Sequence, residues 1–394
     1  MSKKQSHYIQ LDLIILLLAL MTVSILAIYN AQQLGQYPDV NFALQQFIYY
    51  LLGIGIAVVI QFIDLDQLYK SSLYLFIIGV LGVVLLYISP ESLAYPVNNA
   101  KSWFNGPSLP LPFTVQPSEF TKITLIVYLA AIVVKHKEKY EKALARHDLW
   151  LILKILIITT IPVIFIIDQP DLGTSLVFFF IAGVIILLSE IDWKILAAII
   201  VGGIIAVVLS ILLIVNLPEL STKVLGIKPY QIDRIETWFD PTEQVDDDRF
   251  QIDRSLLTIG SGKLTGKGMN NAEVALPEAH TDFIFSVLGE SFGFVGTSVV
   301  VFIFFLLLYR LVTLGMKSFE FSPFGSYICF GFMALILLHT FQNIGMTIGM
   351  MPITGIPLLF ISYGGSTTLS TMIGFGLIYR VAIEESRQQD FLFK

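Results

Sequence analysis

Long apolar stretches alternate with short polar segments along almost the whole chain. Each stretch approaches or exceeds the roughly 20 residues that an α-helix needs to cross a bilayer. The stretches lie at 11–29, 45–63, 71–89, 118–134, 149–167, 172–189, 194–216, 282–309, 324–350 and 355–379. The pattern predicts an all-α, polytopic membrane protein of about ten transmembrane helices, in a single membrane domain over residues 1–394.

Two of the polar connections, residues 90–117 and 217–281, are much longer than the others. Long loops in a compact protein usually have a function. With the first stretch taken as a retained helix, both of these loops fall on the outer side. We expect the second, between the seventh and eighth helices, to contain short amphipathic helices at the membrane surface.

Composition and charge agree with this assignment. The chain is 55% hydrophobic and 14% charged, with a mean hydropathy of +0.78, which is too apolar for a soluble domain. Lysine and arginine gather on the side that holds the N-terminus, so the positive-inside rule places both termini in the cytoplasm. The single cysteine, Cys329, excludes an intrachain disulfide. The five histidines show no spacing typical of a transition-metal site.

Two carboxylates stand out in the segment PEAHTDFIFSVLGESFGFVG at 277–296. Asp282 lies where the polar loop becomes apolar, and Glu290 lies eight residues further on. On one helix they would be about 12 Å apart along the axis and about 80° apart around it. Both could then line one groove that opens at the outer surface. The structural alternatives are that Asp282 caps the helix and that Glu290 pairs with a basic side chain to lock helices together.

Glu119 and Lys122 lie three residues apart at the start of the fourth predicted helix, on one face. Charges at membrane depth are unfavourable and normally face a cavity or a partner. We predict that they form a buried pair whose positive end reaches the Asp282 region. The alternative is that Ser118 and Glu119 cap the helix while Lys122 extends toward the interface.

The stretch GSGKLTGKG at 260–268 resembles a phosphate cradle, with free backbone N–H groups beside Lys263 and Lys267. Its spacing does not fit a nucleotide-binding P-loop. Two interpretations therefore stay open, a flexible basic turn and a contact to an extracytoplasmic pyrophosphate.

Two further motifs interrupt apolar runs. In DQPDLGTSL, 168–176, we favour helix capping for Asp168 and Asp171. In GIPLLFISYGGSTTLS, 355–370, the glycines and hydroxyl residues either permit close helix packing or open polar backbone toward a cavity.

Five of these motifs occur together in a characteristic order: AKSWF, QPSEFTK, QPDLGTS, LPEAHTDFIFSVLGE and MPITGIPLLFISYGGSTTLS. In this order the chain resembles the SEDS (shape, elongation, division and sporulation) family, the RodA/FtsW/SpoVE proteins, over nearly its whole length, and it looks most like RodA. The resemblance implies a peptidoglycan glycosyltransferase of the bacterial plasma membrane that polymerises lipid II at an outward-facing site and releases undecaprenyl pyrophosphate. It further implies a role in cell elongation and shape, with a class B penicillin-binding protein and other elongation-complex membrane proteins as partners, and no nucleic acid.

The resemblance makes Asp282 the essential catalytic carboxylate. An inverting transfer needs a base for the acceptor hydroxyl and positive charge for the leaving pyrophosphate, and Asp282 is our candidate base. Candidate substrate-binding residues are Trp103, Lys101, Glu119, Lys122, Arg254, Lys263, Lys267, His280 and Glu290. Lys101 stands where many relatives carry arginine, so bidentate phosphate geometry is lost. A divalent cation, Mg²⁺ or Mn²⁺, is the candidate cofactor.

Two other functions compete with the polymerase. A lipid II flippase would need critical residues at all depths of the membrane, whereas the strongest motifs here lie on or near the outer side. A non-catalytic scaffold that activates a cell-wall synthase would not need Asp282.

Overall fold

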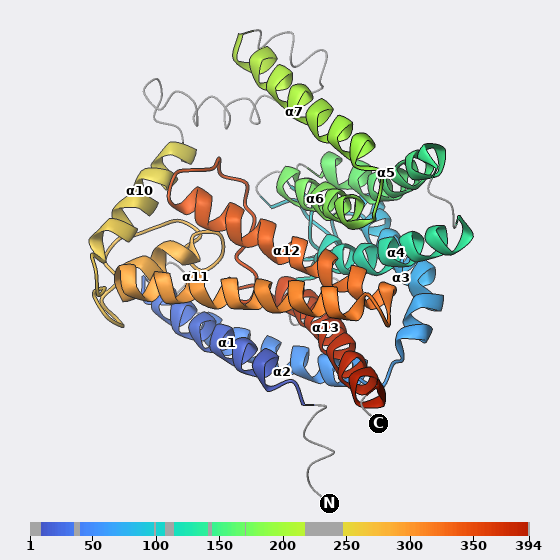
Figure 1. The fold of residues 1–394 in the computed structure, drawn as a ribbon. Coiled ribbons are helices and arrows are strands. Elements are labelled where there is room, and N and C mark those ends of the chain that lie inside the picture. The colour runs from blue at the N-terminus through green and yellow to red at the C-terminus, as the bar shows by residue number, and fades with distance from the viewer. Residues whose placement is uncertain are drawn as a thin grey trace, which may run out of the picture.

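The computed structural model describes residues 9–34, 40–97, 100–106, 114–140, 144–169, 171–216 and 247–392. Within these ranges the protein is mostly helical, and strand-like pairing is limited to two isolated β-bridges, between Val97 and Ala100 and between Phe104 and Val115 (Figure 1). The helices are α1 (Leu11–Gln32), α2 (Phe42–Ile60), α3 (Leu65–Ile88), α4 (Pro117–Lys139), α5 (Ala145–Asp168), α6 (Leu172–Leu188), α7 (Trp193–Asn216), α10 (Asp247–Ser261), α11 (Ile284–Ser318), α12 (Pro323–Thr347) and α13 (Gly365–Leu392).

The predicted all-α membrane fold is confirmed. Of the described helices, 8 are long and apolar enough to cross a membrane, and the shorter α6 is also apolar. The helix α10 confirms that the second long loop contains helical structure. The last predicted helix, 355–379, is wrong at its start, because α13 begins only at Gly365.

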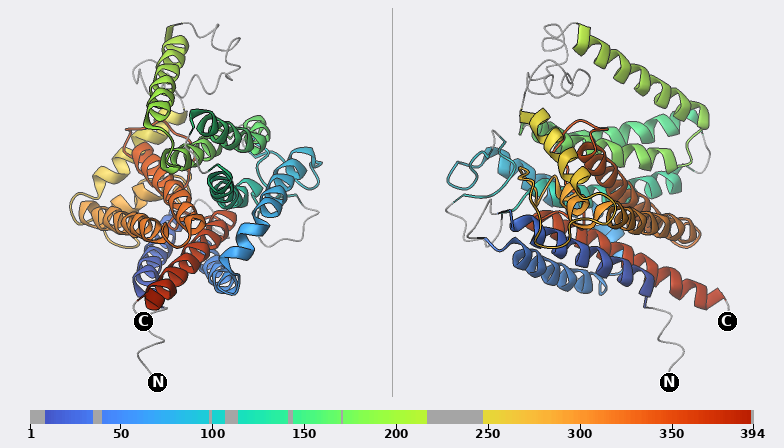
Figure 2. Two further views of the ribbon diagram at one scale, coloured as in Figure 1. Left: turned by 45° about the vertical axis from the view of Figure 1, so that its right-hand side comes forward. Right: turned by 90° about the vertical axis from the view of Figure 1, so that its left-hand side faces the viewer.

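Two helices, α4 and α12, form the centre of the bundle. Each has 78% of its most apolar window buried, whereas the windows of α1, α2 and α3 are between 28% and 39% buried. They pack against each other, and α4 also packs on α3 and α13 while α12 packs on α6 and α11. Helix α7 extends away from the other helices in all three ribbon views (Figures 1 and 2).

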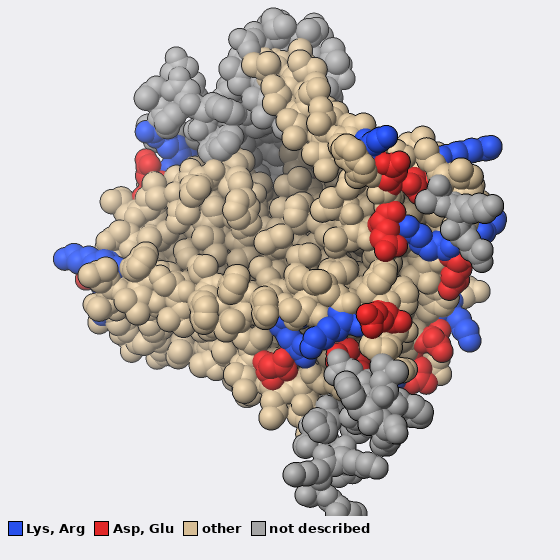
Figure 3. All heavy atoms as spheres, viewed as in Figure 1, with Lys and Arg blue, Asp and Glu red and all other residues tan. Residues whose placement is uncertain are grey.

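Charged side chains gather toward the ends of the bundle and leave a broad uncharged surface between them (Figure 3). At the end where α1 begins and α13 finishes, Arg310 pairs with Asp12 at 2.5 Å and Arg380 pairs with Asp64 at 2.8 Å. The start of α1 and the end of α13 thus lie on the same side of the bundle, as the predicted topology requires. The assignment of that side to the cytoplasm stays a prediction.

Between α12 and α13 the chain crosses the core without helical structure. This part, residues 351–364, is called the 351–364 segment below. Side chains of α1 and α2 donate hydrogen bonds to its carbonyl groups: Ser24 Oγ bonds to Ile361 at 2.8 Å, and Gln46 Nε2 bonds to Ser362 at 3.3 Å. The segment therefore has buried polar backbone that side chains satisfy, and the choice between close helix packing and an opening toward a cavity stays open.

The glycine-rich loop after α10 packs directly on α11. Gly293 interrupts the helical backbone of α11 with φ 64° and ψ −163°, which frees the amide of Phe294 to bond to the carbonyl of Lys263 at 2.9 Å. A Cβ on Gly293 would lie 2.4 Å from the amide nitrogen of Gly266. Only glycine fits both this approach and this φ.

We expect Gly293→Ala to lower the free energy of unfolding by at least about 1–3 kcal/mol, because the new Cβ meets backbone and the positive φ becomes strained. Gly260→Ala is the matched control, since a Cβ there meets nothing within 4 Å and alanine favours the helix by about 0.5–1 kcal/mol. Thermal unfolding in detergent measures both variants. Equal midpoints for the two would contradict the role of Gly293.

Candidate functional site

Asp282 lies in the turn at 277–283, directly before α11. It is half-buried, and its backbone carbonyl accepts a hydrogen bond of 2.8 Å from Asn343 Nδ2. The N-cap of α11 is Phe283, whose side chain makes no cap hydrogen bond, so Asp282 is not the N-cap residue of that helix. Its carboxylate lies against the 351–364 segment, where a Cβ on Gly355 would be 3.6 Å from Asp282 Oδ2.

The turn is held on the 351–364 segment by backbone and ring contacts. Ser362 Oγ donates a hydrogen bond of 2.7 Å to the carbonyl oxygen of Thr281. The backbone amide of Tyr363 donates one of 2.9 Å to the carbonyl oxygen of His280. The His280 ring stacks on Phe42 with centroids 4.3 Å apart. Burial lowers the pKa of His280. His280 therefore has a packing role beside Asp282, and its role toward substrate stays a prediction.

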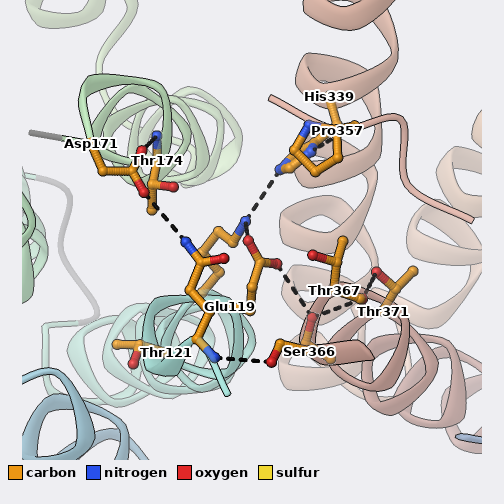
Figure 4. A network of polar contacts seen from close by, with 12 residues as sticks. Glu119, Thr121, Asp171, Thr174, His339, Pro357, Ser366, Thr367 and Thr371 are labelled. Atoms are coloured by element: carbon orange, nitrogen blue, oxygen red, sulfur yellow. Dashed lines mark hydrogen bonds and ion pairs between the residues drawn. The ribbon is translucent and has the colours of Figure 1, made fainter. Parts of the chain in front are cut away.

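Glu119 and Lys122 form the predicted buried pair. Lys122 Nζ lies 2.8 Å from Glu119 Oε1, and the two side chains are 2% and 4% exposed. The N-cap of α4 is Gln116, with no side-chain cap, and Lys122 does not extend outward. Glu119 Oε2 also accepts a 3.4 Å hydrogen bond from Ser370 of α13. Figure 4 shows Glu119 of α4 facing the polar residues of α13.

Two residues of α12 connect this pair to Asp282. Lys122 Nζ lies 3.4 Å from His339 Nε2, and His339 Nδ1 lies 2.9 Å from the carbonyl oxygen of Pro357. One turn further on, Asn343 Nδ2 contacts the carbonyls of both Ile356 and Asp282. The positive end of the pair thus contacts His339, which in turn contacts the 351–364 segment, and its reach to the Asp282 region stays a prediction. The sequence reasoning missed both His339 and Asn343. Their signal was a polar cluster, HTFQN, within an apolar run.

Asp171 N-caps α6, as predicted, by accepting a hydrogen bond of 2.9 Å from the amide of Thr174. It also accepts a 3.4 Å hydrogen bond from Gln116 Nε2, which joins it to the start of α4 (Figure 4). Burial raises the pKa of Asp171. Asp168 does not cap a helix: it is the last residue of α5 and accepts a hydrogen bond of 2.8 Å from Tyr87.

Glu290 does not share a groove with Asp282. Asp282 precedes the helix, and Glu290 Oε1 instead accepts hydrogen bonds from Lys267 Nζ at 2.7 Å and from the amide of Glu273 at 3.1 Å. Lys267 also pairs with the Glu273 carboxylate at 2.9 Å. Glu290 therefore has the structural role given above as the alternative, because its contacts with Lys267 and Glu273 hold the loop against α11.

The remaining candidates lie in the two long connections, 90–117 and 217–281. Lys263 is exposed, and Lys101 Nζ donates to the carbonyls of Tyr87 and Ser89 at the end of α3. Arg254 stacks over a neighbouring ring of α10 at 5.0 Å, and Trp103, in the first connection, is half-buried. The proposed contacts of these four residues with substrate stay predictions.

Among the described residues, no three His, Cys, Asp or Glu side chains lie close enough together to hold a metal ion. Mg²⁺ is commonly held by one or two carboxylates together with water and substrate phosphates. A divalent cation bound mainly by a pyrophosphate would fit this arrangement, and it stays a prediction.

Residues 4–387 match the model of the FtsW/RodA/SpoVE cell cycle proteins. The chain belongs to this SEDS family. A probable peptidoglycan glycosyltransferase FtsW from Wigglesworthia glossinidia brevipalpis is 32% identical over 87% of this chain and 84% of the relative. A protein of the same name from Marinomonas mediterranea is 29% identical over 98% and 89% of the two chains.

Two solved structures are similar to this SEDS protein. One belongs to a study of polymerisation and crosslinking by a peptidoglycan synthase complex, with a TM-score of 0.74 and 26% identity over 95% of this chain and 98% of the other. The second is the rod shape determining protein RodA of Thermus thermophilus, with a TM-score of 0.65 and 25% identity over 94% and 95% of the chains. Both structural neighbours share the fold, whereas the curated relatives named above are FtsW proteins and do not support the RodA-like subdivision.

We expect Glu119→Gln and Lys122→Met each to lower the free energy of unfolding by about 3–5 kcal/mol, because each leaves one buried charge without its partner. The double variant, Glu119→Gln with Lys122→Met, should be more stable than either single variant. Thermal unfolding of the three purified proteins tests this coupling. Single variants with parental stability would show that the pair is incidental.

His280 should make the fold less stable in acid. Its pKa is lowered in the folded protein, whereas the unfolded chain binds a proton with a pKa of about 6.5. The stability associated with neutral His280 is thus present above about pH 6.5 and is lost as the pH falls toward the folded pKa. His280→Phe keeps the aromatic stacking and does not titrate, so its unfolding midpoint should fall less between about pH 7 and pH 5 than that of the parent. An identical fall would exclude His280 as the cause.

Proposed function

We propose that the protein is a peptidoglycan glycosyltransferase that polymerises lipid II, with Asp282 as the general base. The observation that carries this proposal is the position of Asp282, a half-buried carboxylate at the start of α11 beside the 351–364 segment. A base must reach the acceptor hydroxyl of a substrate whose lipid remains in the membrane. Family membership and the curated relatives named peptidoglycan glycosyltransferase support the same activity.

The chemistry is an inverting transfer. The acceptor hydroxyl attacks the anomeric carbon of the donor, the bond to the pyrophosphate breaks, and undecaprenyl pyrophosphate leaves. Asp282 takes the hydroxyl proton, a role that is typically worth roughly 10²–10⁴-fold in rate. The developing negative charge on the pyrophosphate needs a preorganised cation. Lys122, whose ammonium is connected to the Asp282 turn through α12, and the outer-loop lysines are the candidates.

The cellular role that we propose is peptidoglycan synthesis in division, because the curated relatives named above are FtsW proteins. This replaces the elongation role that the RodA-like motifs predicted. The neighbour from a peptidoglycan synthase complex supports a partner that supplies crosslinking, which we take to be a class B penicillin-binding protein. In this proposal both termini are cytoplasmic and the Asp282 turn faces outside.

The decisive test is polymerisation of labelled lipid II by the purified protein, with and without its penicillin-binding partner. Asp282→Asn nearly keeps the size of the side chain and removes its basicity, so we expect glycan synthesis to fall by roughly 10²–10⁴-fold at unchanged thermal stability. Asp282→Glu should recover little, because a displacement of about 1 Å can cost roughly 10²-fold.

The control is Asp192→Asn. Asp192 directly precedes α7, and its side chain accepts a hydrogen bond from the amide of Lys194 in that helix. This variant should polymerise at the parental rate. Near-parental synthesis by well-folded Asp282→Asn would refute base catalysis and favour the flippase or scaffold alternatives.

A further inference from the structure

Helix α12 presents two buried polar side chains, His339 and Asn343, to the 351–364 segment. They are 1% and 0% exposed. Their spacing of four residues places them on one face of the helix. On that face they lie between the ammonium of Lys122 and the backbone of Asp282. The chemistry proposed above assigns no role to His339 or Asn343.

The neighbours of His339 fix its protonation state and its tautomer. The carbonyl oxygen of Pro357, 2.9 Å from Nδ1, can only accept, so Nδ1 carries the hydrogen. The ammonium of Lys122, 3.4 Å from Nε2, can only donate, so Nε2 offers its lone pair. A protonated imidazole would direct an N–H group at the ammonium. His339 is therefore a neutral connection between a buried cation and the 351–364 segment.

The neighbours of Asn343 fix the orientation of its amide in the same way. Nδ2 lies 2.8 Å from the carbonyl of Asp282 and 2.9 Å from that of Ile356. Both neighbours are acceptors, so the nitrogen must face them and the amide cannot be flipped. Its two N–H groups thus bond to two different parts of the chain. The side chain of Asn343 thereby joins the turn that carries Asp282 to Ile356 in the 351–364 segment.

We propose that Asn343 and His339 are positioning residues for glycosyl transfer. Asn343 sets the position of the Asp282 turn relative to the 351–364 segment, and His339 holds the same segment against Lys122. This inference rests on the proposed role of Asp282 as the base. Because displacement of a catalytic group by about 1 Å can cost roughly 10²-fold in rate, the loss of either connection should lower kcat while leaving the binding of lipid II nearly unchanged.

Asn343→Asp tests the first connection. The aspartate has the same shape, but its oxygen faces two carbonyl oxygens in place of the N–H groups. We expect kcat to fall by about 10-fold to 100-fold with little change in the KM for lipid II. Ser326→Ala is the control. It removes a buried hydrogen bond of 2.7 Å from another α12 side chain to a backbone carbonyl, that of Gly315. It should lower the unfolding midpoint and retain the parental kcat.

If Asn343→Asp does not accumulate, Asn343→Ser, which can donate one hydrogen bond, replaces it and should show a smaller fall in kcat. Parental kcat in the folded variant, alongside an inactive Asp282→Asn, would overturn the positioning role and leave the proposed function standing. An active Asp282→Asn would instead refute the base on which this inference rests.

Two variants of His339 separate its two contacts. In His339→Asn the amide N–H group lies near the position of Nδ1 and can keep the Pro357 bond, whereas in His339→Gln the amide oxygen lies near Nε2 and can accept from Lys122. We expect the asparagine variant to keep more of kcat, because the segment stays in place, and the glutamine variant to keep more thermal stability, because Lys122 stays paired. The opposite order of kcat would overturn the role of the Pro357 bond.

Discussion

The carbonyl groups of the 351–364 segment have to find hydrogen-bond donors inside the bundle, because apolar surroundings offer none and an unsatisfied backbone group there is strongly unfavourable. Helices satisfy their own backbone, but this segment is not helical. Its donors include side chains of three other helices, among them Ser24 of α1, Gln46 of α2 and Asn343 of α12. The arrangement of these helices around the segment is therefore as much a matter of hydrogen bonding as of apolar packing.

The same constraint explains why the sequence predicted most of the fold and misplaced one helix. Apolar runs of bilayer length are sufficient evidence for helices such as α1 and α5. The run from 355 also contains apolar residues, of which Leu358 and Ile361 are fully buried, yet it is irregular up to Gly364. Hydropathy cannot separate these cases, because some donors that satisfy the irregular backbone, such as Ser24 and Gln46, are more than 300 positions away in the chain. Pro352, Gly355 and Pro357 were the available local signals.

The candidate site shows the same division between local and distant information. The Glu119–Lys122 pair was predictable because its members lie three residues apart on one face. For Glu290 the sequence left two interpretations open, because its partner Lys267 belongs to a separate loop that packs on α11 beside the break at Gly293. His339 and Asn343 gave no strong signal, because their function depends on backbone atoms of segments that the sequence does not place together.

Asp282 and Lys122 occupy different environments for a physical reason. A buried ion pair contributes little net stability compared with a well-packed apolar replacement, so stability alone does not account for an ammonium that is 2% exposed. Glu119 neutralises it, and the neutral His339 accepts from it without adding charge. A fixed cation can thus persist at depth, where its field is screened less than in water. Asp282 lies at the half-buried start of α11 and remains accessible to a substrate hydroxyl. The glycosyl transfer proposed above forms a bond between the acceptor oxygen and the donor sugar and breaks the bond from that sugar to the pyrophosphate. It would therefore use a base for the acceptor hydroxyl and a cation for the leaving pyrophosphate.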